Sequence, residues 1–123
     1  MSKVIIRSAT KEDTPQLLEM VRHLAEYQKA LDKVTITPEE FEQAGFGRDS
    51  IWESYIAEYE GHITGFALYY KGFRTWRGRR LYLEDIYVEP EYRRSGIGKL
   101  LFEALIERTR ELGFSGMDWQ GLE

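Results

Sequence analysis

The stretch that decides the fold is LYLEDIYVEPEYRRSGIGK, residues Leu81 to Lys99, which predicts a buried strand, a tight basic turn and the start of a helix. Two arginines and two glycines stand where the strand gives way to the helix: Arg93, Arg94, Gly96 and Gly98. Free backbone N–H groups at a helix N-terminus, with cations beside them, suit a pyrophosphate. Glu84 and Asp85 lie inside the apolar strand, where an unpaired charge is costly. The stretch therefore indicates group transfer from a phosphorylated carrier.

Two better-known glycine patterns do not fit this turn. A Walker A loop ending at Gly98-Lys99 needs glycine where Arg93 stands and Ser or Thr where Leu100 stands. A dinucleotide-binding fingerprint beginning at Gly96 needs glycine where Leu101 stands. The pattern that remains is Arg-x-x-Gly-x-Gly, between a strand and an amphipathic helix.

That pattern resembles the acyl-CoA-binding signature of the GCN5-related N-acetyltransferases (GNAT). The resemblance extends to about Trp119 and is closest to the diamine branch, which includes spermidine/spermine and thialysine acetyltransferases. It rests on the segments 5–13, 24–27, 45–47, 65–70 and 81–85. Of these, the Leu-Tyr-Leu-Glu-Asp strand at 81–85 is more specific than the glycine turn.

The resemblance implies a mixed α/β (α+β) GNAT fold, a single domain over 1–123 with a central, mostly antiparallel sheet flanked by helices. The residue patterns predict strands at 4–7, 52–59, 62–71, 79–88 and 115–120, with a hairpin at Glu60-Gly61 and a loop at 72–78. They predict helices after the capping box of Thr10 and Asp13, from Thr37 to near Gly45, and from Gly96 to Gly113. The apolar stripe expected on the first helix is Leu17, Leu18, Val21, Leu24 and Ala25.

Complete family members continue past this last strand with a helix, carrying the tyrosine that acts as general acid, and a final hairpin. We therefore expect a C-terminally incomplete domain that lacks this helix and hairpin. The terminal Leu122-Glu123 favours a truncated chain, with a naturally shortened protein as the alternative.

Composition limits the function. The chain has no cysteine, so disulfides and thiolate chemistry are excluded, and it has neither a membrane-spanning apolar stretch nor a signal-peptide core. We expect a cytoplasmic protein that does not bind membranes. The net charge of −4 argues against nucleic acid, yet residues 71–99 hold eight Lys/Arg against four Asp/Glu. This distribution suits a cationic substrate with an anionic carrier, or is a solvated surface with no function.

Strand alternation predicts that Glu84 shares a face with Ile86 and Val88, whereas Asp85 shares the other face with Tyr87. Apolar neighbours would raise the pKa of Glu84 towards that of a general base. By resemblance, Glu84 takes the proton of the amine and Asp85 binds the charge of the substrate. The alternative is that both carboxylates are surface or salt-bridged groups.

The resemblance implies acetyl-CoA as co-substrate and no metal. Backbone N–H groups of Ile86, Tyr87 and Val88 would bind the pantetheine, and the pyrophosphate would be bound by Arg93, Arg94, Ser95, Gly96, Ile97, Gly98 and Lys99. The alternative is a glycine turn without a ligand.

Tyr27 matches an aromatic near the amine site of the family, and Trp76 lies in the loop before the central strand, where it could line the path of the amine. Gln28 stands where polyamine enzymes have a glutamate, which favours a shorter amine such as a lysine analogue. Tyr70 is expected to pack in the sheet, and His23 to lie at the surface.

The sequence thus predicts an acetyl-CoA-dependent N-acetyltransferase that acts on a primary amine of a small polycation, such as a diamine, polyamine or lysine analogue, by direct attack on the thioester. The resemblance implies a homodimer. The alternative is a truncated, non-catalytic fragment that binds CoA or dimerises.

Overall fold

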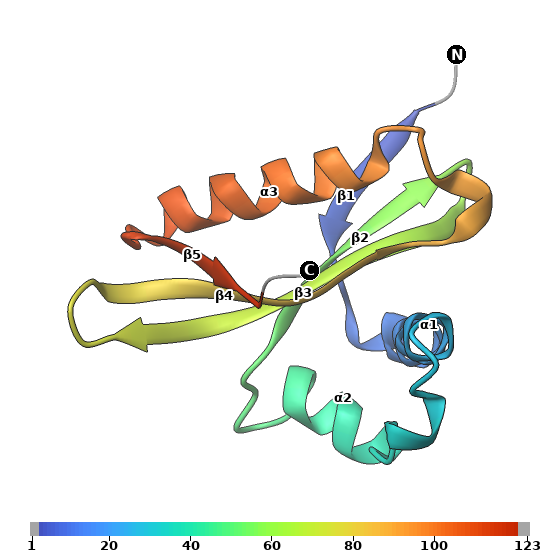
Figure 1. The fold of residues 1–123 in the computed structure, drawn as a ribbon, viewed down its shortest axis with the longest axis horizontal. Helices are drawn as coiled ribbons and strands as arrows, with labels where there is room; N and C mark the ends of the chain where they lie inside the picture. Colours follow the sequence, from blue (N-terminus) through green and yellow to red (C-terminus); the bar gives the residue numbers. More distant parts are fainter. Residues whose placement is uncertain (1–2, 121–123) are drawn as a thin grey trace.

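The computed structural model describes residues 3–120 (Figure 1). Five strands form one sheet in the order β1-β2-β3-β4-β5: β1 (Val4–Ser8), β2 (Glu53–Tyr59), β3 (His62–Arg74), β4 (Gly78–Val88) and β5 (Gly116–Trp119). The first three pairings are antiparallel and only β4 with β5 is parallel. The helices are α1 (Thr14–Tyr27), α2 (Pro38–Phe46) and α3 (Ile97–Glu111), with short 3-10 turns η1 (Lys11–Asp13), η2 (Leu31–Lys33) and η3 (Pro90–Tyr92). The predicted mixed, mostly antiparallel sheet is confirmed.

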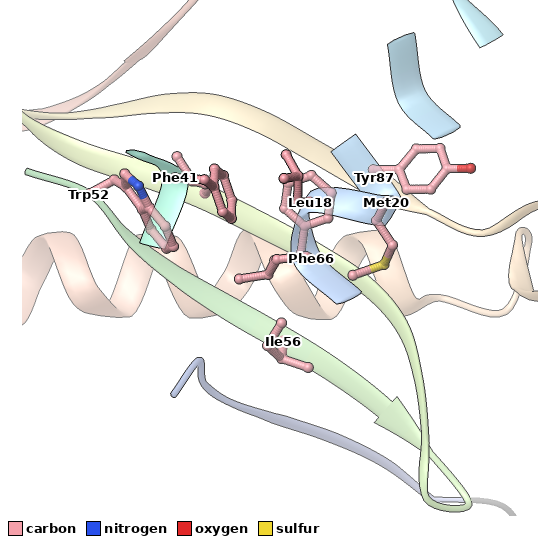
Figure 2. Packing of buried hydrophobic residues seen from close by; sticks show 9 residues of the cluster. Leu18, Met20, Phe41, Trp52, Ile56, Phe66 and Tyr87 are labelled. Atoms are coloured by element: carbon pink, nitrogen blue, oxygen red, sulfur yellow. The ribbon is translucent and has the colours of Figure 1, made fainter. Parts of the chain in front are cut away.

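Helices cover both faces of the sheet: α3 crosses one face and α1 with α2 cover the other (Figure 1). The α1/α2 side buries large side chains of both helices against the sheet, among them Leu18, Met20, Phe41 and Phe66 (Figure 2). Met20 is fully buried although the predicted stripe on the first helix omitted it. The α3 side buries Leu101 and Leu105 on β3 and β4.

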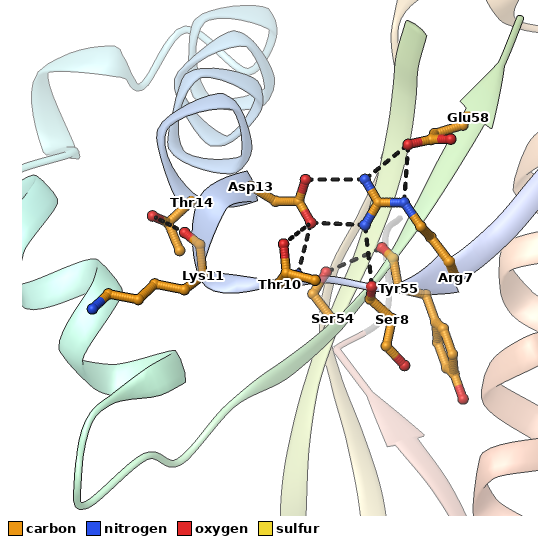
Figure 3. Close-up of polar contacts among 9 residues, drawn as sticks. All are labelled: Arg7, Ser8, Thr10, Lys11, Asp13, Thr14, Ser54, Tyr55 and Glu58. Atoms are coloured by element: carbon orange, nitrogen blue, oxygen red, sulfur yellow. Dashed lines mark hydrogen bonds and ion pairs between the residues drawn. The ribbon is translucent and has the colours of Figure 1, made fainter. Parts of the chain in front are cut away.

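The predicted capping box is present where the chain turns from β1 into η1 and α1. Thr10 N–H donates to Oδ2 of Asp13 at 2.7 Å. The same carboxylate accepts two hydrogen bonds from the Arg7 guanidinium, at 2.7 and 3.0 Å, while Nε of Arg7 donates to Glu58 at 2.9 Å (Figure 3). Arg7 holds the pKa of Asp13 down at about 2. This cluster ties the start of α1 to β1 and β2.

The predicted loop at 72–78 is wrong, because β3 continues to Arg74 and β4 already begins at Gly78. Only Thr75, Trp76 and Arg77 form the turn, and Gly78 has a φ of +86°, a conformation that glycine adopts without strain. The result is a long β3–β4 arm that extends beyond β2, seen on the left of Figure 1.

No helix within residues 3–120 is long and apolar enough to cross a membrane. The predicted chain end at Leu122-Glu123 lies outside the described residues.

Candidate active site

The site lies where β4 and β5 part. β5 pairs with β4 only from Arg80 to Leu83, so within the described residues the edge of β4 from Glu84 to Val88 has no strand neighbour on that side. Two adjoining cavities occupy this region and share Leu24, Gln28, Ile86 and Phe102. They give a ligand access to a free strand edge next to the basic turn.

The first cavity, of about 510 Å³, runs along the predicted carrier-binding residues. It is lined by Ile86, Tyr87 and Val88 of the strand edge, by Arg93 and Arg94 of the turn, and by Ile97 and Gly98 of α3. The structure therefore brings these predicted residues together, whereas Ser95 and Gly96 of the turn and Lys99 of α3 do not line the cavity.

The turn itself has a left-handed backbone conformation at two positions. Arg94 and Gly96 have φ values of +68° and +87°, and Gly96 precedes the first residue of α3. This left-handed conformation exposes the first N–H groups of α3 at the positive end of its dipole. The Ser95 hydroxyl donates within the turn, to the carbonyl oxygen of Tyr92. Arg94 and Lys99 are exposed, so their charges can reach an anion in solution.

The second cavity, of about 620 Å³, holds the two carboxylates together with Leu83, Gln28 and Trp119. Their environments differ from the predicted ones. The ladder to β3 shifts at this point: Leu68 pairs with Asp85 and Tyr69 with Leu83, which leaves Glu84 without a partner residue on β3. This extra residue is a β-bulge, which locally reverses the alternation of a strand.

Because of the bulge, the side chains of β4 do not face the sides of the sheet that strict alternation predicts. Leu83 and Ile86 both pack on the α3 side, although simple alternation would separate them, and Tyr87 packs on the α1/α2 side. Glu84 is exposed and accepts a hydrogen bond from the Tyr70 hydroxyl at 3.0 Å. The predicted burial of Glu84 is therefore wrong.

Asp85 is the carboxylate whose pKa is shifted by its surroundings. Burial, and then the charge of the neighbouring Glu84, raise the pKa of Asp85 from 3.8 to about 6. The bulge explains why the two carboxylates differ. It places Asp85, which pairs with Leu68, against the sheet, and it leaves Glu84, which has no partner on β3, in solvent.

The structure places the two aromatic candidates differently. Tyr27, at the end of α1, lines the first cavity and is 69 % exposed. Trp76 lies at the tip of the β3–β4 arm, is 96 % exposed and lines neither cavity of the site. The structure therefore does not bring Trp76 together with the other candidates.

Two groups next to the site, Tyr70 and His23, make contacts that the sequence does not predict. Tyr70 was expected only to pack, yet it binds Glu84, and the pKa of its hydroxyl is raised to about 12 by burial and by this hydrogen bond. His23 was expected at the surface without a partner, yet its Nδ1 lies 2.9 Å from Glu89 Oε2. No sequence signal links residues 66 positions apart, so only the spatial arrangement of α1 and β4 could reveal this pair.

The family model "Acetyltransferase (GNAT) family" matches residues 17–121. The bovine (Bos taurus) thialysine N-epsilon-acetyltransferase is 38 % identical over 97 % of this chain and 78 % of its own length. The human (Homo sapiens) spermidine/spermine N(1)-acetyltransferase-like protein 1 is 36 % identical over 81 % of this chain and 15 % of its own length.

Among solved structures, an aminoglycoside acetyltransferase from an uncultured soil metagenomic sample, in complex with sisomicin, superposes with a TM-score of 0.79. It is 20 % identical, and the match covers 98 % of this chain and 78 % of that one, so it shows the shared fold alone. The family model matches most of the chain, and the bovine relative is similar over nearly all of it. The chain therefore belongs to the GNAT acetyltransferase family and is an N-acetyltransferase.

Proposed function

We propose that this protein transfers the acetyl group of acetyl-CoA to a primary amine of a small cationic amino acid, of the type of a lysine analogue. The observation that carries the proposal is that the two cavities share four lining residues, so that a basic turn and a pair of carboxylates lie beside each other along one free strand edge.

The carrier would bind along the first cavity. Main-chain groups of Ile86, Tyr87 and Val88 would pair with the amides of the pantetheine as an added strand does. The pyrophosphate would lie on the turn from Arg93 to Lys99, where the exposed N–H groups of α3 and the cations of Arg93 and Arg94 converge. The thioester would then lie near the bulge.

The carboxylate pair would prepare the amine. An alkylammonium has a pKa of about 10 and must lose a proton before it can attack. Asp85, whose pKa of about 6 lies near neutrality, is the better proton acceptor, and the exposed Glu84 would hold the incoming positive charge. This assignment exchanges the roles expected from the sequence.

The reaction would proceed by direct attack. The amine nitrogen bonds to the carbonyl carbon, the carbon–sulfur bond breaks, and sulfur leaves as the CoA thiolate, which takes a proton from solvent. The nitrogen gives up one proton before attack and a second as the amide forms. No enzyme nucleophile is needed, because a thioester is already activated.

Two observations favour a lysine analogue over a long polyamine. Thialysine acetyltransferases are among the similar proteins that the chain matches over 97 % of its length. In addition, the neutral Gln28 lines both cavities, so a distant second ammonium would find no charge at this position.

The test is titration calorimetry of the chain with acetyl-CoA, followed by thialysine or spermidine with thiol release monitored. Thiol release with thialysine faster than with spermidine is expected. Acetyl-CoA binding without release from any amine would support the alternative of a non-catalytic CoA-binding fragment, and no binding would refute the carrier site.

We also propose a homodimer, since the outer edge of β5 has no partner strand among the described residues and an open edge favours pairing. Light scattering after size exclusion tests it, and a monomer at micromolar concentration would refute it.

A further inference from the structure

Three elements meet at Glu89, just beyond the end of β4. Nδ1 of His23, on α1, lies 2.9 Å from Oε2 of Glu89. The hydroxyl of Tyr87, on β4, donates to Oε1 of Glu89 at 2.9 Å. The Glu89 N–H donates to Thr64 on β3 at 2.8 Å, so the main chain is fixed as well. Both carboxylate oxygens are thus engaged, and only 17 % of the side chain is exposed.

The Tyr87 ring, whose hydroxyl donates to Glu89, also contacts the guanidinium of Arg93 in the basic turn. Cζ of Arg93 lies 5.4 Å from the centroid of the Tyr87 ring and 4.9 Å from that of Tyr27. Nε of Arg93 donates to the carbonyl oxygen of Val88 at 2.8 Å. The exposed guanidinium of Arg93 is therefore held at the first cavity by the rings of Tyr27 and Tyr87 and by one hydrogen bond.

We propose that Glu89 is a positioning residue, which, together with His23, fixes the Tyr87 ring and so holds Arg93 ready for the pyrophosphate of the carrier. This inference rests on the proposed function. A free arginine side chain loses about 2 kcal/mol of rotamer entropy when a ligand orders it. Holding the Arg93 side chain in place before binding lowers that entropy loss, so Glu89 and His23, which do not line the first cavity, raise the affinity for the carrier without touching it.

The arrangement makes carrier affinity depend on pH through His23. The groups that face His23 are Glu19 on its own helix, at 3.2 Å, and Glu89 beyond β4. The cavity beside it is lined by charged or titratable groups from β1, η1, β2, β3 and η3: Arg7, Asp13, Glu58, His62, Glu91 and Tyr92. The hydrogen bond to Glu89 raises the pKa of His23 above 6.5, against the opposing effect of burial.

The direction of the pH dependence follows from the pairing of His23 with Glu89. Below its raised pKa, His23 is charged and binds Glu89 strongly. As the pH rises through that pKa, His23 becomes neutral, its hold on Glu89 weakens, and affinity for the carrier falls.

The experiment measures the Kd for CoA by calorimetry at pH 6 and pH 8.5. Four variants are compared with the wild type: Glu89→Gln, Tyr87→Phe, His23→Gln and, as control, Glu19→Gln. Tyr87→Phe keeps the ring under Arg93 and removes only the hydroxyl. Glu19→Gln changes the other partner of His23, and Glu19 itself does not contact β4. The phosphates of CoA also titrate near pH 6, but the ratio of variant to wild-type Kd at each pH cancels this contribution.

We expect Glu89→Gln and Tyr87→Phe to raise the Kd roughly fivefold, from the loss of one hydrogen bond to a charged group, reduced for partial exposure. His23→Gln should raise the Kd at pH 6 and leave it within about twofold of the wild type at pH 8.5, a pattern that general damage to the fold would not give. Glu19→Gln should change the Kd less than Glu89→Gln at both pH values, because Glu19 contributes less than Glu89 to the raised pKa of His23.

Equal Kd values for all variants, or a His23→Gln ratio independent of pH, would overturn the proposal while leaving the carrier site intact. A wild type that does not bind CoA would refute the carrier site and this inference with it.

Discussion

Replacing Asp85 by asparagine should make the protein more stable at neutral pH and much less active. In the folded state burial and the charge of Glu84 disfavour the ionised form of Asp85, so the pKa is raised from 3.8 to about 6. Asparagine has nearly the same shape and no charge, so it removes this cost together with the proton acceptor.

The magnitude follows from linkage. A rise from 3.8 to about 6 is about 2.2 pKa units, which at 1.36 kcal/mol per unit is roughly 3 kcal/mol. Because Asp85 keeps part of its surface in water, we expect roughly half of this, about 1–2 kcal/mol. Below pH 3.8 the carboxyl is protonated in both the folded and unfolded states and costs nothing; the cost grows as the pH rises and is complete above pH 6.

The assay is urea unfolding of wild type and Asp85→Asn at pH 3.5 and pH 7.5. The variant should gain about 1–2 kcal/mol at pH 7.5 and nothing at pH 3.5. Asp32→Asn, the same chemical change at an exposed position on η2, serves as control and should gain nothing at either pH. A gain independent of pH, or no gain at pH 7.5, would refute the reasoning about Asp85.

Three further predictions test other parts of the structure. Glu84→Gln removes the like charge beside Asp85, so the acid limb of kcat/KM, set by a pKa of about 6, should move to lower pH; a pH–rate profile in which the limb stays in place contradicts the assignment. Gly96→Ala forces a side chain into a φ of +87°, a strain of about 1–2 kcal/mol, and calorimetry should show weaker binding of CoA; unchanged affinity would mean that the turn does not contact the carrier. Asp13→Asn should lower the free energy of unfolding by roughly 2 kcal/mol at pH 7, because Arg7 holds the pKa of Asp13 near 2. The same stabilisation should vanish from the wild type as the pH falls from 3.8 through 2, and equal urea midpoints of both proteins at pH 7 would contradict it.

Local signals were sufficient for most of the fold. The capping box of Thr10 and Asp13 and the start signal at Thr37-Pro38 lie within four residues of the helices they begin, so the chain itself specifies them. The hairpin at Glu60-Gly61 was equally readable, because a glycine with positive φ is part of the turn. The basic glycine turn was located for the same reason: its conformation is a property of Arg94, Gly96 and the helix they precede.

The two carboxylates needed the tertiary structure. Alternation is a rule for one strand alone, whereas the bulge at Glu84 arises from the register between β3 and β4, and the register depends on packing against both helix layers. Burial of Asp85 and exposure of Glu84 follow from that register, and so does the exchange of their proposed roles. The pairing of His23 with Glu89 likewise required α1 to lie across the sheet.

The sequence by itself therefore determined the family, the order of the elements and the position of the basic turn, because these depend on neighbours along the chain. Only the tertiary structure decided which carboxylate has the raised pKa and which side chains hold Arg93, because pKa values and cation contacts depend on desolvation and on groups brought together from distant segments.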